Sequence, residues 1–314
     1  ISIYEPATGK YWYNYQGDKY FVPASNTKIP TCYAAMKYLG DSLVGLRYGI
    51  PEERWFKENV VVVKPTGDPT FLHFDYKVHP SFNFLKSVSA KKQKVGYCID
   101  KSRVERWGSG WSWNDYDAAY MAERNVFPVF GNVIRARLND STMRVYSDTF
   151  LTTGKTKIGQ LVKTQSNYFD SLITSYSPWI SVENAISSEP KFEIERAIAD
   201  NRFTIKKSNS AFSSISIPFV TNQSSTTLGF LKDTLGKGFR YAVDEGNNKY
   251  LWEEEDADIM YVTINKWSAV YSQPTDSVLK PMMHRSDNFF AEQSLLMVSN
   301  ERLGVMNDAK IIDT

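Results

Sequence analysis

The chain has 314 residues, 42% of them apolar and 23% charged, a composition that excludes a disordered or fibrous protein. Its 37 basic residues nearly balance its 35 acidic ones, and the net charge of +2 argues against nucleic acid as a partner. No segment approaches the roughly 18 consecutive apolar residues that a membrane-spanning helix requires. The length is sufficient for two or three domains.

The first 40 residues predict an antiparallel β meander followed by a helix. Residues 1–4 and 10–15 are rich in β-forming side chains and are separated by the turn signal at 8–9. These opening residues lack the basic segment that begins a signal peptide, so an exported protein would be present here in a mature or trimmed form. Residues 26–39 predict a helix that Gly40 ends.

The middle of the chain predicts mostly short strands between loops rich in Ser, Thr and Asn. A buried strand at 59–63 ends in a turn-rich run at 64–70, and residues 162–190 are predicted to lie at the surface. Further strand candidates are 95–99, 126–138, 192–206 and 214–220. A strand at 258–265 and helices at about 275–284 and 287–303, the second ending near Gly304, are the last predicted elements.

The cysteines and histidines predict neither a disulfide nor a metal site. Cys32 and Cys98 have a spacing that does not establish pairing, and two free buried thiols are the preferred interpretation. Cys32 lies one turn beyond Lys28 and is predicted to pack in the core. His73 and His79 lack a third ligand at any standard spacing, so we interpret them as ordinary loop histidines.

A serine and a lysine three residues apart occur at Ser25 and Lys28. At this spacing on a helix, a hydroxyl and an amine lie on one face, and a lysine whose pKa is lowered by burial can take the serine proton. The same pattern at Ser89, Ser188 and Ser277 shows that it is weak by itself. Ser25 differs because it follows a turn and opens a helix, although it could serve only as a helix cap.

A second polar motif occupies Ser286, Asp287 and Asn288. A serine and an amide two residues apart at the boundary of an element can point to the same side, where the serine relays a proton and the amide holds a substrate carbonyl. S-x-N also occurs at Ser81 and Ser112, so the alternative interpretation is a polar cap ahead of the following helix.

Both motifs belong to longer segments. S-x-x-K and S-D-N are two of the three motifs of penicillin-binding proteins and class A β-lactamases. The segments are FVPASNTK at 21–28, PTGDPT at 65–70, GSGWSWND at 108–115 and MHRSDNFFAEQ at 283–293. Together they resemble the DacB-like D-alanyl-D-alanine carboxypeptidases and endopeptidases, the class C low-molecular-mass penicillin-binding proteins of peptidase family S13. PT at 65–66 replaces the glycines usual in that family.

This resemblance implies an α/β (α+β) transpeptidase-like domain, in which an antiparallel sheet is flanked by helices, with a large and mostly β insertion. Residues 1–58 and 250–314 would form the transpeptidase-like domain. Residues 59–139 and 216–249 would form an inserted second domain, and residues 140–215 a third domain nested in it. The separation of about 260 residues between Ser25 and Ser286 fits such an insertion and not a class A β-lactamase.

The resemblance also implies catalysis through an acyl-enzyme, without a metal or cofactor. Ser25 would attack the carbonyl between two D-alanines, with Lys28 as the base. Ser286 and Asn288 would complete the proton and carbonyl network. Penicillins and other β-lactams would acylate the same serine and act as inhibitors.

By the same resemblance, the substrates are peptidoglycan stem peptides, met in the periplasm or cell envelope. Asp115 would face the ammonium of a diaminopimelate side chain, the alternative being a solvated turn residue. Trp113, with Trp111, would line that pocket or pack between domains. Asp68 and Glu292 are interpreted as structural. The oligomeric state and a peripheral membrane association stay open.

The third family motif, Lys-Thr-Gly or a variant, is absent from the sequence. In the family its strand follows S-x-N, binds the substrate carboxylate and donates part of the oxyanion hole. We therefore expect these residues to be part of a longer protein, and a chain ending at Thr314 to be inactive. The alternatives are a non-catalytic peptidoglycan-binding scaffold, which the 14% aromatic content would suit, and a β-lactamase, for which no dedicated deacylation base is visible.

Overall fold

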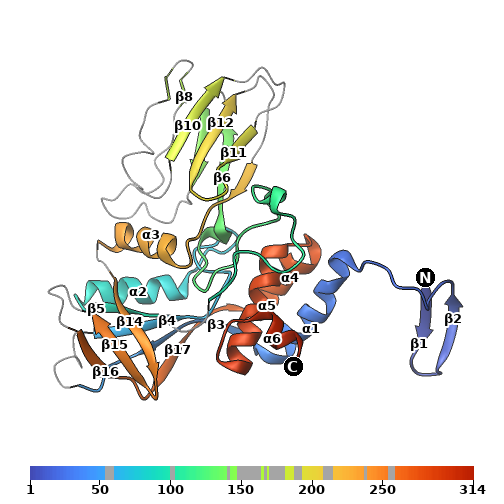
Figure 1. The fold of residues 1–314 in the computed structure, drawn as a ribbon, viewed down its shortest axis with the longest axis horizontal. Coiled ribbons are helices and arrows are strands. Elements are labelled where there is room, and N and C mark those ends of the chain that lie inside the picture. Colours follow the sequence, from blue (N-terminus) through green and yellow to red (C-terminus); the bar gives the residue numbers. More distant parts are fainter. Residues whose placement is uncertain are drawn as a thin grey trace.

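The fold consists of a helix–sheet body, a smaller group of strands at one end and an N-terminal hairpin that projects from the body (Figure 1). The computed structural model describes residues 1–53, 60–99, 103–139, 142–146, 164–165, 168–169, 181–186, 193–207, 215–236, 239–253 and 259–314. Most of the predicted surface stretch at 162–190 and most of the predicted nested domain at 140–215 lie outside these ranges.

The body is built on a seven-stranded sheet in the order β16-β15-β14-β5-β4-β3-β17. Its strands are β3 (Ser42–Gly49), β4 (Val60–Pro65), β5 (Lys94–Ile99), β14 (Phe239–Gly246), β15 (Lys249–Glu253), β16 (Ile259–Thr263) and β17 (Trp267–Pro274). The β4–β5 and β5–β14 pairings are parallel and the other four are antiparallel. The sheet is therefore mixed, whereas an antiparallel sheet was expected. Helix α2 (Pro80–Ala90) lies in the connection from β4 to β5. Such a helical crossover returns the chain to the same end of the sheet, so the two strands that it connects run parallel.

Both faces of strand β4, near the middle of this sheet, are buried. The valines of β4 alternate between two hydrophobic clusters: Val61 and Val63 pack with α2 and α3 (Ser225–Leu235) on one face. Val60 and Val62 pack with strands β5, β14 and β16 on the other face. A continuous run of β-branched residues is typical of a strand that is covered on both sides, which explains why this strand could be predicted from sequence.

The sheet also crosses the domain limits proposed from sequence. Strands β3 and β17 come from the segments assigned to the transpeptidase-like domain, whereas β4, β5 and β14 come from those assigned to the inserted domain. A boundary at 58/59 or 249/250 would divide a hydrogen-bonded sheet. The division into three domains stays a proposal.

A layer of helices lies beside the β3 and β17 edge of the sheet (Figure 1). It contains α1 (Lys28–Tyr38), α4 (Thr275–His284), α5 (Asn288–Leu303) and α6 (Asp308–Ile312). Three of these helices share one core, in which Ala35 of α1, Met282 of α4 and Phe290 of α5 are fully buried. The predicted helices are confirmed, and Gly304 ends α5 with a φ of 71°, a conformation that costs glycine little.

The remaining strands form the N-terminal hairpin and the inserted group. Strands β1 and β2 pair as predicted. The predicted strand at 192–206 is instead a hairpin of β11 and β12, with a turn at 197–201, and only the second half of the candidate at 126–138 is a strand, β6. The bounds are β1 (Ser2–Glu5), β2 (Lys10–Asn14), β6 (Val133–Asn139), β7 (Thr142–Tyr146), β8 (Thr164–Gln165), β9 (Tyr168–Phe169), β10 (Ser181–Ile186), β11 (Glu193–Arg196), β12 (Arg202–Lys207) and β13 (Ile215–Pro218).

Cys32 and Cys98 are not joined in a disulfide; Cys98 is buried, and Cys32 is half-buried against the helix core. His73 and His79 lie in loops as predicted, but they are buried, with exposures of 3% and 5%. Among the described residues, no group of three His, Cys, Asp or Glu side chains could hold a metal ion. No helix in these ranges is long and apolar enough to cross a membrane.

His73 makes stability depend on pH. Burial lowers the pKa of His73 to about 3, whereas an unfolded histidine titrates near 6.5. Between these values the unfolded state binds a proton that the folded state does not, so stability is complete above pH 6.5 and is lost as the pH falls toward 3. The loss has an upper bound of about 5 kcal/mol.

We expect His73→Asn to weaken this pH dependence, because asparagine does not titrate. The asparagine side-chain oxygen can still accept the hydrogen bond that the Asp75 N–H now donates to His73 Nδ1 at 3.2 Å. Urea unfolding at pH 7 and pH 4 measures the effect, with the exposed His284→Asn as the control. An unchanged difference between the two pH values in His73→Asn would contradict this assignment.

Candidate active site

Ser25 lies in a short 3-10 turn, η1 (Ala24–Thr27), that leads directly into α1. Ala24 before it has a φ of 45°, a left-handed conformation that is uncommon for a residue with a side chain and often accompanies functional turns. The Ser25 side chain is exposed. Neither η1 nor α1 is capped by a side-chain hydrogen bond, so Ser25 does not act as a helix cap.

Lys28 is the first residue of α1 and is only 7% exposed. Its Nζ lies 3.2 Å from Ser25 Oγ and 2.5 Å from Asn288 Oδ1. Burial lowers the pKa of Lys28, and the negative charges of Asp287 and Glu292 partly oppose this shift. A buried amine in contact with an accessible hydroxyl is the arrangement that general-base activation of a serine requires.

The S-D-N motif meets this pair from the other end of the chain. Ser286 Oγ donates to Ser25 Oγ at 2.9 Å, so the hydroxyl of Ser25 contacts both Lys28 and Ser286. Ser286 has a φ of 55°, and the next residue, Asp287, caps α5 by accepting a hydrogen bond from the Phe290 N–H. This turn places Ser286 and Asn288 on the side of α5 that faces α1.

The other copies of the serine–lysine pattern do not form such a group. Ser89 Oγ donates to the carbonyl of Leu235, and Ser277 Oγ donates to the carbonyl of Pro274 within the first turn of α4. Ser188 lies outside the described residues. Only Ser25, among the described serines of this pattern, has its lysine within hydrogen-bonding distance, which supports the choice made from sequence.

An open cleft of about 900 Å³ adjoins Ser25 and Lys28. It runs between α1 and α5 toward α6, and the loop at 108–111 forms another part of its wall. Its lining is mixed: Ala34 and Val298 contribute apolar surface, and Asn288 and Glu292 contribute polar atoms. The cleft is therefore suited to an extended ligand whose polar groups lie near Ser25.

Glu292 fastens the loop at 104–124 to α5, one turn after Asn288. Its Oε1 accepts from Trp111 Nε1 at 3.0 Å, and its Oε2 forms an ion pair with Arg124 at 3.3 Å. Arg124 is 5% exposed and also pairs with Asp308 of α6 at 2.5 Å. The structural role predicted for Glu292 agrees with these contacts, whereas the sequence pattern gave no signal for Arg124.

The carbonyl of Tyr120 is a second contact of this loop that the sequence did not indicate. Asn288 Nδ2 donates to the Tyr120 carbonyl at 3.1 Å, so Asn288 bridges Lys28 and the loop. Trp111 stacks on the Tyr120 ring with 6.2 Å between ring centres. Desolvation and the nearby carboxylate of Asp115 raise the pKa of the Tyr120 hydroxyl.

The two residues predicted to bind the substrate side chain lie apart from the cleft. Asp115 is half-buried in the 3-10 turn η2 (Trp113–Asp115), and Trp113 is 72% exposed and packs against little of the described chain. Neither residue lines the cleft beside Ser25, unlike Trp111. Their role in binding stays a prediction.

Asp68 has a structural position, as predicted. It is 2% exposed, and its Oδ1 accepts from the Thr70 N–H at 2.9 Å and from Thr70 Oγ1 at 2.8 Å. Gln293 donates to the Gly67 carbonyl at 2.8 Å and so joins this turn to α5. The turn at 65–70 therefore supports the helix that carries the S-D-N motif.

Comparisons with known proteins bear on the fold and on the family. The crystal structure of penicillin binding protein 4 (dacB) from Haemophilus influenzae has a similar fold, with a TM-score of 0.58 and 17% identity over 97% of this chain and 63% of that one. The chain thus spans less than two thirds of the length of that structure. No curated protein matches the sequence. The model of the D-Ala-D-Ala carboxypeptidase 3 (S13) family matches residues 1–308, and the chain belongs to that family.

Proposed function

We propose that this chain carries the nucleophile of a serine DD-peptidase, which hydrolyses D-alanyl-D-alanine or D-alanyl-diaminopimelate bonds of peptidoglycan. The observation that carries the proposal is the contact of Ser25 Oγ with both Lys28 Nζ and Ser286 Oγ, at 3.2 and 2.9 Å. Membership of the S13 family supports the substrate class. The proposed location of the protein is the periplasm or cell envelope, where such stem peptides occur.

In the proposed acylation, neutral Lys28 takes the proton of Ser25 as Oγ attacks the carbonyl carbon of the penultimate D-alanine. The tetrahedral intermediate collapses, the amide C–N bond breaks, and the leaving amine receives a proton passed through Ser286. The products are free D-alanine and an ester on Ser25. Asn288 holds Lys28 through its Oδ1, so it fixes the base relative to the nucleophile.

Water then hydrolyses the ester, regenerates Ser25 and releases the shortened peptide. A penicillin would acylate Ser25 in the same way through its lactam carbonyl, but its amine stays tethered to the acyl group. Penicillins would therefore inhibit the enzyme as slowly released covalent adducts. In this proposal the Lys-Thr-Gly strand that completes the oxyanion hole lies outside the 314 residues.

Release of D-alanine from a stem pentapeptide tests the proposal, measured for the 314-residue chain and for the protein at its full encoded length. We expect turnover by the full-length protein and little or none by the 314-residue chain. If the full-length protein binds peptidoglycan but releases no D-alanine and takes up no penicillin, it is a binding scaffold. Rapid hydrolysis of free penicillin would instead indicate a β-lactamase.

The proposed role of Asp115 leads to a specificity prediction. If its carboxylate faces the side-chain ammonium of the stem peptide, Asp115→Asn should raise KM for a diaminopimelate peptide by about tenfold, the size of one charge-assisted hydrogen bond. The same substitution should leave KM unchanged for a peptide whose side-chain amine is acetylated. Equal changes for both peptides would mean that Asp115 recognises no cation.

A further inference from the structure

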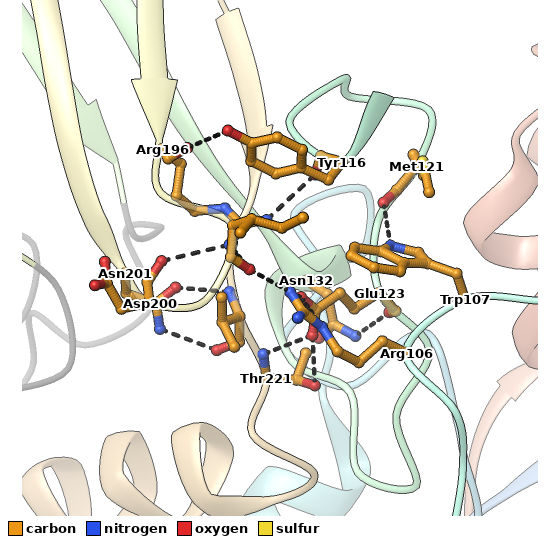
Figure 2. A network of polar contacts seen from close by, with 12 residues as sticks. Arg106, Trp107, Tyr116, Met121, Glu123, Asn132, Arg196, Asp200, Asn201 and Thr221 are labelled. Atoms are coloured by element: carbon orange, nitrogen blue, oxygen red, sulfur yellow. Dashed lines mark hydrogen bonds and ion pairs between the residues drawn. The ribbon is translucent and has the colours of Figure 1, made fainter. Parts of the chain in front are cut away.

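A buried polar junction joins the inserted strands to the loop beside the active site (Figure 2). At its centre Glu123 is fully buried, and its Oε1 accepts from Arg106 Nε at 2.9 Å and from Nη2 at 2.5 Å. Its Oε2 accepts from the Thr221 N–H at 2.9 Å and from Oγ1 at 3.1 Å. Arg106 also donates to the carbonyl of Ile198, in the β11–β12 turn. Glu123 and its partner Arg106 therefore join the loop to Thr221 and to the β11–β12 turn.

Arg196, the last residue of β11, contacts the loop beside the active site directly, at Tyr116. It is 2% exposed, and its Nη2 donates to the Tyr116 carbonyl at 3.2 Å. The Tyr116 hydroxyl donates in return to the Arg196 carbonyl at 2.8 Å. The guanidinium lies 5.3 Å from the centre of the Tyr116 ring, so both the backbone and the ring of Tyr116 are held (Figure 2).

Tyr116 belongs to the same turn that contacts the catalytic group. It directly follows Asp115, and Tyr120, four residues later, accepts the hydrogen bond from Asn288. Bonds from Ala118 N–H to the Asp115 carbonyl and from Met121 N–H to the Ala118 carbonyl, both 2.9 Å, tie the intervening backbone together. Residues 112–121 are thus held by Arg196 on one side and by Asn288 on the other.

Burying the guanidinium of Arg196 carries a desolvation penalty, which an apolar side chain of similar length would avoid. Packing alone therefore does not explain a cation at this position. The negative charge of Glu123 offsets part of the positive charge of Arg196 without a direct hydrogen bond. The hydrogen bonds described for the Arg196 guanidinium go instead to the backbone carbonyls of Tyr116, Ala197, Ile198 and Asp200. A planar group with several fixed donors is suited to fixing the relative position of two backbones.

We propose that Arg196 is a positioning residue, which acts through Tyr116 to hold residues 112–121, and with them Asp115 and the Tyr120 carbonyl, against Asn288. The inserted strands would thereby set the geometry of the substrate-binding loop. The catalytic consequence rests on the function proposed above, whereas the positioning itself does not.

Hydrogen–deuterium exchange of the protein, analysed by mass spectrometry, tests the positioning step without reference to activity. Arg196→Met keeps the length of the side chain but removes its donors, and Tyr116→Phe removes only the hydroxyl bond. We expect exchange in 112–121 to become about tenfold faster in Arg196→Met and less so in Tyr116→Phe. The control is Arg202→Met, an exposed arginine of the same hairpin that pairs with Asp200.

Exchange in α1 and α5 should stay as in the wild type. Unchanged exchange in 112–121 for Arg196→Met, or equal acceleration throughout the molecule, would overturn the inference, since the second result would indicate an ordinary structural role.

Kinetics of the full-length protein separate this inference from the proposed function. Arg196→Met should raise KM for the diaminopimelate peptide about tenfold, while the rate of penicillin acylation, which does not need a stem-peptide side chain, changes less than about twofold. If the wild-type protein released no D-alanine, the proposed function would be wrong. The exchange experiment would still test whether Arg196 positions residues 112–121. Equal losses with peptide and penicillin would contradict a role confined to the loop.

Discussion

Replacement of Ser25 by alanine should abolish both D-alanine release and labelling by a fluorescent penicillin, because the substitution removes the only atom proposed to form the acyl bond. The effect should be a complete loss of label on a denaturing gel, since a covalent adduct survives denaturation. Ser25 is exposed and its side chain caps no helix, so the substitution should leave the melting temperature nearly unchanged.

Ser277→Ala is the matched control, because Ser277 has the same spacing to a lysine but donates to the carbonyl of Pro274. It should label like the wild type. If Ser25→Ala keeps its label, or if Ser277→Ala loses it, the nucleophile has been assigned to the wrong residue.

Replacement of Lys28 by methionine should lower the rate of penicillin acylation by about 10² to 10⁴-fold, the usual contribution of a general base. Methionine fills the same space, and removing the amine also leaves Asn288 without the partner that its Oδ1 now has at 2.5 Å. Lys280→Met is the matched control, because Lys280 belongs to the Ser277 copy of the pattern. Acylation of Lys28→Met within about threefold of the wild type would exclude Lys28 as the base.

The wild-type rate should depend on pH in a defined direction. The amine can accept a proton only when neutral, so acylation should be slow at low pH and rise as the pH passes through the pKa of Lys28. Burial lowers that pKa, which places the rise below the pH at which an ordinary lysine titrates. Stopped-flow acylation between pH 5 and 10 measures this limb, and in Lys28→Met the limb should disappear.

Local spacing explains what the sequence revealed about the site. Residues three apart at the start of a helix must lie on one face, so the contact between Ser25 and Lys28 follows from the pattern once the helix is recognised. The contact of Lys28 with Asn288 spans 260 residues, and only the resemblance of whole segments to a known family could predict it. The carbonyl of Tyr120 could not be predicted, because a backbone acceptor leaves no mark in the sequence.

The errors in the fold have two separate origins. The helix Pro80–Ala90 was missed, although Phe82, Leu85 and Val88 follow a helical spacing and are buried. The antiparallel sheet was expected from the family resemblance, whereas the parallel pairing of β4 with β5 accompanies this unpredicted helical crossover. The strand predicted at 126–138 begins only at Val133, because hydrogen bonds of the Asn132 side chain with Val129 N–H and the Glu123 carbonyl hold the preceding residues in a buried loop.

Peptide mapping of the full-length protein after reaction with benzylpenicillin tests the acyl-enzyme most directly. Cleavage after lysine yields a peptide from Tyr20 to Lys28 in which Ser25 is the only serine. We predict that this peptide gains the mass of one intact penicillin molecule, as expected for opening of the lactam ring by Ser25, and that fragmentation places the added mass on Ser25. An adduct on any other peptide, or no adduct on the full-length protein, would contradict the assignment of Ser25 as the nucleophile.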